Sequence, residues 1–223
     1  MSTLERAIAG FLRHRGDSLA LAREAGREAP GLAAALEAQF PEVEHATVVN
    51  LSDDVLLERG DTPYFVDAVA LVDEKFLEVF PYELVVGNPE MAFGQKDQIV
   101  LTVSEARRLF GSEDPMGQVL TGLNDLDYRV TGIVEDNPSS SHLQYDVLVS
   151  WASTVPGNGA LDFGWLNNWL TQANYTYVLL ALGADPAALE AKLPAFMQRH
   201  FAERADQYFL YLQPLPDIYL DSS

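Results

Sequence analysis

The run QIVLTVSEARRLFGSEDPMGQVL, residues 98–120, packs a strand, a short helix and a sharp turn into one segment. Its first six residues, 98–103, are mostly aliphatic and β-branched, which predicts a strand. Thr102 and Glu105 stand in capping-box spacing, so a helix is expected to begin there. An apolar Leu-Phe pair closes that helix, and Gly111 is a typical C-terminal cap. The segment therefore predicts a strand followed directly by a two-turn amphipathic helix.

The acids after this helix raise the question of a metal or phosphate loop. Glu113 and Asp114 precede Pro115, which presets φ, and Gly117 can adopt the positive φ of a tight reversal. An EF-hand loop needs oxygen ligands at alternating positions and a closing glutamate, and this run does not complete that pattern. We therefore predict a solvated turn that leads into a strand from Val119.

Outward from this segment, the chain shows two strand–helix–strand patterns, in residues 18–51 and 174–213. Proline stands at the start of the helix in each pattern, as Pro30 and Pro186, where a first turn tolerates it. Two such βαβ halves commonly interlock into a ferredoxin-like layer. The stretch between them, 85–143, has its own helix and strands and looks inserted. The predicted fold class is α+β.

Other local patterns give further predictions. The stretch VLLERGDTPYFVDAVALVD, residues 55–73, is typical of a β-hairpin whose turn is RGDTP. Residues 1–16 are interpreted as a short helix or as the edge of an excised piece, and Pro194 is expected to kink or shorten the last helix. The predicted core is aromatic and aliphatic: Phe76, Phe80, Leu109, Phe110, Val130, Ile133, Tyr177 and Leu179.

Composition narrows the classes of function. The 14 Lys and Arg stand against 33 Asp and Glu, giving a formal net charge of −19, and such a surface repels nucleic acid. The absence of cysteine excludes disulfides, thiolate metal sites and a cysteine nucleophile. No apolar run reaches the length of a membrane span. We expect no nucleic-acid partner and no cofactor.

The sequence contains none of the common catalytic motifs in complete form. The four histidines, His14, His45, His142 and His200, lack a second ligand at metal spacing. There is no G-x-S-x-G elbow, no Walker loop and no G-x-G-x-x-G. The paired acids are neighbours in turns, whereas hydrolytic carboxylates must face each other across a cleft. We therefore expect no catalytic, metal or cofactor-binding residues.

Four runs in a fixed order carry a resemblance. They are FLEVFPYELVVGNPEMAF (76–93), QIVLTVSEARRLFGSEDPMGQVL (98–120), YRVTGIVEDNPSSSHLQYDVLVS (128–150) and YLQPLPDIYLDS (211–222). In this order they resemble the extracytoplasmic, periplasmic core domain of macrolide-exporter-type (MacB/FtsX-type) ABC transporter permeases. Tyr219 stands where that family frequently has histidine.

The resemblance implies a two-part domain. A discontinuous porter-like lobe, 1–84 and 144–223, would be built from the two βαβ halves, and 85–143 would form a smaller inserted α/β lobe. The domain would lie on the periplasmic side of the bacterial inner membrane, as a soluble piece of an integral membrane protein. It would couple ATP-driven transmembrane motion to substrates or partner proteins there, without catalysis of its own.

The resemblance also implies partners. They are transmembrane helices of the same permease outside this chain, a cognate cytoplasmic ATPase, a second permease in a homodimer or pair, and a periplasmic adaptor. From the residues themselves, the Gly- and Trp-rich run 157–170 is a candidate partner contact through Phe163, Trp165 and Trp169, because exposed aromatics anchor interfaces. Burial of the tryptophans in the core is the competing interpretation.

Two alternatives stay open at this stage. One is a soluble small-molecule or peptide-binding module of ferredoxin-like type, which requires an apolar pocket with convergent polar groups. The other is an acidic hydrolase with carboxylates that the sequence does not bring together. The coupling domain further predicts that the two ends of the domain lie close together on one side.

Overall fold

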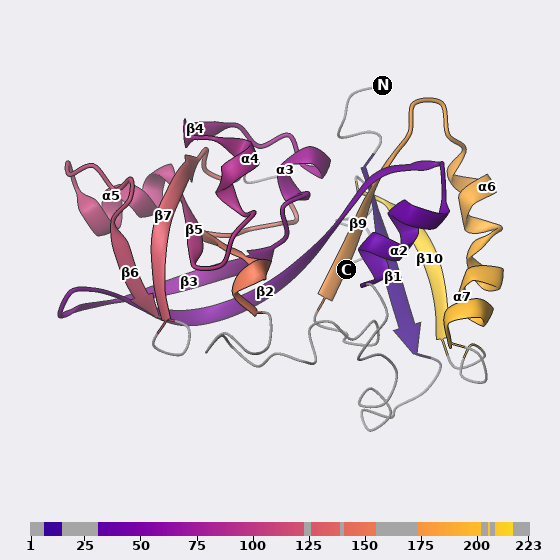
Figure 1. Cartoon of the computed structure of the whole chain (residues 1–223), viewed down its shortest axis with the longest axis horizontal. Helices are drawn as coiled ribbons and strands as arrows, with labels where there is room; N and C mark the ends of the chain where they lie inside the picture. The colour runs from indigo at the N-terminus through magenta and orange to yellow at the C-terminus, as the bar shows by residue number, and fades with distance from the viewer. Residues whose placement is uncertain are drawn as a thin grey trace. The chain divides into compact units, whose positions relative to one another are not determined.

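The structure is a computed structural model that describes residues 7–14, 31–122, 126–138, 141–154, 174–201, 205 and 208–215. Its contacts divide the chain into two units. The first comprises residues 1–48, 78–80 and 164–223, and the second comprises residues 49–77 and 81–163. The fold is mixed α+β, as predicted (Figure 1).

The elements run in the following order along the described residues: β1 (Ala7–His14), α2 (Leu32–Gln39), β2 (Val43–Arg59), β3 (Thr62–Val72), α3 (Phe76–Val79), β4 (Leu84–Gly87), α4 (Pro89–Ala92), β5 (Gln98–Thr102), α5 (Val103–Phe110), β6 (Val119–Gly122), β7 (Leu126–Val134), β8 (Val147–Ser150), the 3-10 helix η2 (Trp151–Thr154), β9 (Asn174–Leu180), α6 (Pro186–Glu190), α7 (Leu193–Phe201) and β10 (Tyr208–Pro214).

The first unit is a sheet with the strand order β10-β1-β9-β2, packed against α2, α6 and α7. β1 is antiparallel to both β9 and β10. A single apolar cluster joins the helices to the sheet, and Phe40 packs on Phe196 with ring centroids 5.4 Å apart. Because Ile8 pairs with Pro214, the first described strand begins beside the end of the last one.

The second unit is a closed ring of six strands, β2-β3-β8-β5-β7-β6, in which β6 pairs with both β7 and β2 (Figure 1). β4 adds to β7 beyond the part of that strand that pairs with β6. Each of the six strands contributes buried side chains, including Leu57, Val66, Leu148, Leu101, Tyr128 and Leu120, all fully enclosed. Side chains of this kind fill the interior of a small barrel.

The interpretation of residues 1–16 as a helix is wrong for the part that the structure describes. Residues 7–14 form the strand β1, which pairs on both sides with distant strands. A short apolar run suits a helix or a strand equally, and tertiary pairing decides between them. The stretch 18–25, expected to hold the first strand, lies outside the described residues.

The boundaries of the two units differ from those of the expected lobes, 1–84 with 144–223 and 85–143. Residues 49–77, expected in the porter-like lobe, belong to the barrel unit. The reason is the length of β2, whose 17 residues extend from the first unit into the second. The assignment of lobes and of their roles stays a prediction.

Several local predictions are confirmed. The hairpin turns at Gly60, with φ of 59°. Gly111 caps α5 at φ 62°, and Asp185 caps α6 through the amide of Ala187. The run containing Pro194 is split into two helices, α6 and α7. All eight residues of the predicted core are buried.

Candidate partner-contact surface

The residues expected at a partner contact, Phe163, Trp165 and Trp169, lie outside the described part of the chain. The choice between core and interface for this segment therefore stays a prediction. The described residues offer a different surface, which is built on the barrel unit around α5 and the β2–β3 hairpin.

Helix α5 begins at Thr102, whose Oγ1 accepts a hydrogen bond from the Glu105 amide at 3.2 Å. The expected capping box is only half formed, because the Glu105 carboxylate turns away from Thr102 and binds Arg108 instead. Arg108 Nε lies 2.7 Å from Glu105 Oε2, and Nη2 lies 2.5 Å from Oε1. Glu105 is 5% exposed, so this is a bidentate pair with a buried carboxylate.

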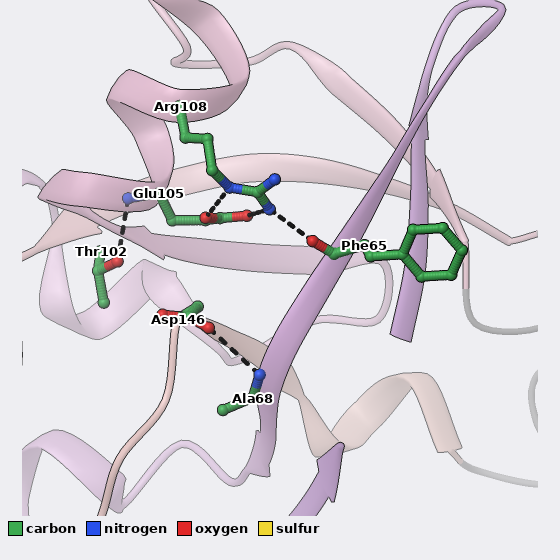
Figure 2. A network of polar contacts seen from close by, with 6 residues as sticks. All are labelled: Phe65, Ala68, Thr102, Glu105, Arg108 and Asp146. Atoms are coloured by element: carbon green, nitrogen blue, oxygen red, sulfur yellow. Dashed lines mark hydrogen bonds and ion pairs between the residues drawn. The ribbon is translucent and has the colours of Figure 1, made fainter. Parts of the chain in front are cut away.

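The same guanidinium holds the neighbouring strand. Arg108 Nη2 donates to the carbonyl oxygen of Phe65 on β3 at 2.8 Å, as Figure 2 shows. The hydrogen bonds to Glu105, followed by the charges of Asp146 and Asp67, raise the pKa of Arg108 above its ordinary value, although partial burial opposes this. We call Glu105 and Arg108, together with the Phe65 carbonyl, the clamp.

Asp146 holds β3 at Ala68, three residues beyond Phe65. Its Oδ2 accepts from the Ala68 amide at 3.2 Å, and its own amide donates to Ala68 oxygen at 2.8 Å. Its carbonyl accepts from the Thr102 amide at 3.0 Å. One aspartate at the entrance to β8 therefore ties β3 to β5, the strand that carries α5. Figure 2 shows its contact with Ala68.

The outer side of the hairpin carries an exposed apolar pair. Leu56 and Phe65 are cross-strand partners, with exposed fractions of 39% and 69%. In Figure 2 the Phe65 ring points away from Arg108, while its carbonyl faces that residue. The clamp therefore fixes the backbone from one side, and the ring projects from the other.

The turn after α5 is structural. The Asp114 carboxylate accepts from the Met116 amide at 3.0 Å, and Gly117, at φ 75°, donates to Val130 oxygen at 2.8 Å. Glu113 pairs with Arg59 of β2. Arg59 also donates to the Leu109 carbonyl at 3.1 Å. The turn thus leads the chain from α5 back to the strands of the barrel.

Replacing both Glu113 by Gln and Asp114 by Asn should change the free energy of unfolding by less than about 1 kcal/mol. The Arg59–Glu113 pair is solvent-exposed on the glutamate side, and such pairs contribute little. Asparagine can still accept the Met116 hydrogen bond. Thermal melts with and without a chelator measure this. A large loss, or a melting temperature that falls with chelator, would mean that these acids hold a cation.

Other titratable side chains also lie in ion pairs or in buried positions of the fold. His45 lies between Glu78, 3.0 Å from its Nε2, and Glu37, 3.7 Å from its Nδ1. Burial lowers the pKa of His142 and raises the pKa of Tyr145. Within the described ranges, no group of three His, Asp or Glu side chains is placed to hold a metal ion.

The clamp and the exposed pair were not found by sequence reasoning. The spacing of Glu105 and Arg108, one helical turn apart, was a signal for an ion pair, but not for the buried carboxylate. The alternation within FVDAVALV was a clearer signal, because it places Phe65 and Asp67 on the face opposite Val66. That pattern indicates an aromatic residue on the polar side of the hairpin.

Comparison with known protein families gives a match over residues 1–196 to the MacB-like periplasmic core domain. The chain belongs to this family. The resemblance expected from the four ordered runs is thereby confirmed, as is its location on the periplasmic side of the membrane. The domain is that of MacB-like ABC transporter permeases, which pair with cytoplasmic ATPases.

Three solved structures share the fold. A domain of a candidate permease protein from Porphyromonas gingivalis has 23% identity and a TM-score of 0.74, covering 96% of this chain and 92% of that one. The periplasmic region of MacB from Actinobacillus actinomycetemcomitans has 14% identity and a TM-score of 0.64, with coverage of 99% and 95%.

The third is the extracellular domain of the noncanonic ABC-type transporter YknZ from Gram-positive bacteria, at 11% identity and a TM-score of 0.63, with coverage of 93% and 99%. A comparison with curated proteins gives no match. In the part of the chain that the structure describes, no helix is long and apolar enough to cross a membrane.

Proposed function

We propose that this domain couples ATP-driven motion of its permease to substrates or partner proteins in the periplasm, without catalysis of its own. The observation that carries the proposal is the pairing of β1 with β10, in which Ile8 lies opposite Pro214. If membrane helices adjoin these two described strands, their motion reaches the domain at one place, because β1 begins beside the end of β10. Family membership supports the same role.

The topology of the first unit supports its assignment as a ferredoxin-like porter lobe. Its sheet order is β10-β1-β9-β2, with α2 between β1 and β2 and with α6 and α7 between β9 and β10. Two strand–helix–strand halves interleaved in this way are the arrangement expected of that lobe. The barrel unit would then be the lobe that carries partner contacts.

The proposed partners are transmembrane helices of the same permease, the cognate ATPase, a second permease in a homodimer or pair, and a periplasmic adaptor. The segment with Phe163, Trp165 and Trp169 remains a proposed contact for one of them. The alternative, a small-molecule or peptide-binding module, gains no support from the barrel interior, which side chains fill. Reproducible stabilisation by a ligand in a thermal-shift screen would favour that alternative.

The coupling role can be tested in the full-length permease reconstituted with its ATPase. Flexible Gly/Ser segments of about ten residues are inserted between the domain and the helices on both sides. Such linkers behave as random coils and do not transmit force. Transport should be lost while basal ATP hydrolysis continues.

The same insert in the exposed turn at Leu182–Gly183 is the control, because a surface turn tolerates insertions. That variant should keep transport. Full transport with both flexible junctions in place would overturn the coupling role.

A further inference from the structure

The outer face of the β2–β3 hairpin has an apolar centre and an acidic rim. Leu56 and Phe65 form the centre, and their direct cross-strand pairing makes one continuous apolar contact area. Glu58 follows Leu56 by two residues and Asp67 follows Phe65 by two residues, so both acids share that face of the strands. Asp54 is exposed beside them.

The charge of this face is not balanced by the basic residue of the hairpin. Between positions 54 and 67 stand the acids Asp54, Glu58, Asp61 and Asp67 and the single base Arg59. Arg59 turns to the other side of the hairpin, where it pairs with Glu113 and lies 4.6 Å from the Phe110 ring centroid. Arg108 of the clamp offsets part of the charge of Asp67, and the acids Asp54, Glu58 and Asp67 still outnumber this base around the aromatic ring.

The hairpin is held rigid behind this surface. The clamp fixes the Phe65 carbonyl, and Asp146 fixes Ala68 three residues further along the same strand (Figure 2). A side chain presented on a backbone that is already ordered loses little further freedom on binding, which favours affinity. The Phe65 ring is exposed, whereas Val66 and Leu57 supply the buried side of this part of the hairpin.

We propose that Leu56 and Phe65 are the centre of a docking surface for a partner protein with an apolar socket edged by lysine or arginine. The proposal rests on the coupling function, for which it names the contact. The acidic rim selects the occupant: it attracts a basic edge, and it repels both anionic lipid and the same face of a second copy of this chain. Aromatic anchors at the centre of a patch carry most of the binding energy in protein interfaces.

The surface can be probed with two synthetic helical peptides of equal length, each bearing one Leu/Phe stripe. One has lysine along both edges of the stripe, and the other has glutamate. Fluorescence anisotropy with the 223-residue chain should show binding of the lysine-edged peptide only. Phe65→Ser should weaken it by at least about tenfold, as expected for an anchor residue.

Matched variants separate this surface from general attraction to an acidic protein. Met91→Ser removes another exposed apolar side chain, at 65% exposure, and should leave the affinity unchanged. The triple variant Asp54→Asn, Glu58→Gln, Asp67→Asn should weaken binding and flatten its salt dependence, whereas Glu74→Gln, Glu83→Gln, Glu90→Gln should not. Melting curves of Phe65→Ser check that the fold is retained, because the ring is exposed.

Equal affinity of wild type and Phe65→Ser, or equal binding of both peptides, would overturn the proposal. A photoreactive phenylalanine analogue at position 65 of the full-length permease gives the second readout. Permease dimers or lipid adducts as the sole cross-linked products would reject the docking surface. Loss of transport with flexible junctions but not with Phe65→Ser would reject this surface while retaining the coupling function.

Discussion

Replacing Gly122 by alanine should open the barrel and lower its stability by about 2–3 kcal/mol, the range of a forced steric overlap in a packed interior. Gly122 pairs with Leu57 where β6 meets β2, and among the described residues Glu58 and Thr121 form the other pair of this seam. A Cβ at this position would lie 2.6 Å from the Leu56 carbonyl oxygen and 2.5 Å from Leu57 Cδ2. The leucine side chain can rotate away, but the carbonyl belongs to the backbone, so the strands must separate.

Urea titration measures the loss, and hydrogen exchange locates it. The amides of β6 and of the facing part of β2 should exchange faster in Gly122→Ala, while those of the first unit stay protected. Gly94→Ala is the control, since its Cβ would meet only Glu90 oxygen at 3.8 Å, an ordinary contact. That variant should match wild type or be slightly more stable. A Gly122→Ala protein as stable as wild type would mean that β6 does not close the ring tightly.

This seam shows which part of the fold the sequence could predict. Strand 98–102, helix 103–110 and its glycine cap follow from residues within a few positions of one another, and they were predicted. The closure of the ring depends on a pairing between Leu57 and Gly122, which are far apart in the chain. Neither local sequence identifies the strand with which it pairs, so the sequence did not predict the closed ring.

Residues 7–14 were predicted as a helix for the same reason: the contacts that make them a strand are long-range. AIAGFLRH is apolar enough for a helix or a strand, and β9 and β10 decide the matter by pairing on both of its edges. The candidate surface also combines one feature that the local sequence could predict with one that it could not. Alternation in β3 could have placed Phe65 on the outer face, because period two is local. Its support from Arg108 is a long-range contact, and only the structure reveals it.

Replacing Arg108 by methionine should destabilise the barrel by about 2–3 kcal/mol. The change leaves the Glu105 carboxylate, 5% exposed, without its bidentate partner, and the Phe65 carbonyl without its donor. Removing one member of a fully buried pair costs about 3–5 kcal/mol, and the smaller figure reflects the 44% exposure of the Arg108 side chain. Chemical denaturation measures the effect, and Arg107→Met, which removes a neighbouring exposed charge, should stay within about 0.5 kcal/mol of wild type.

A second substitution distinguishes a lost partner from lost packing. Adding Glu105→Leu to Arg108→Met removes the uncompensated buried charge, and most of the stability should return, because an apolar pair can replace a buried ion pair. The double variant still lacks the donor to the Phe65 carbonyl, so it should bind the lysine-edged peptide more weakly than wild type although Phe65 is unchanged. Wild-type stability in Arg108→Met alone would show that water already solvates Glu105. Full peptide affinity in the stable double variant would show that the clamp does not position the docking surface.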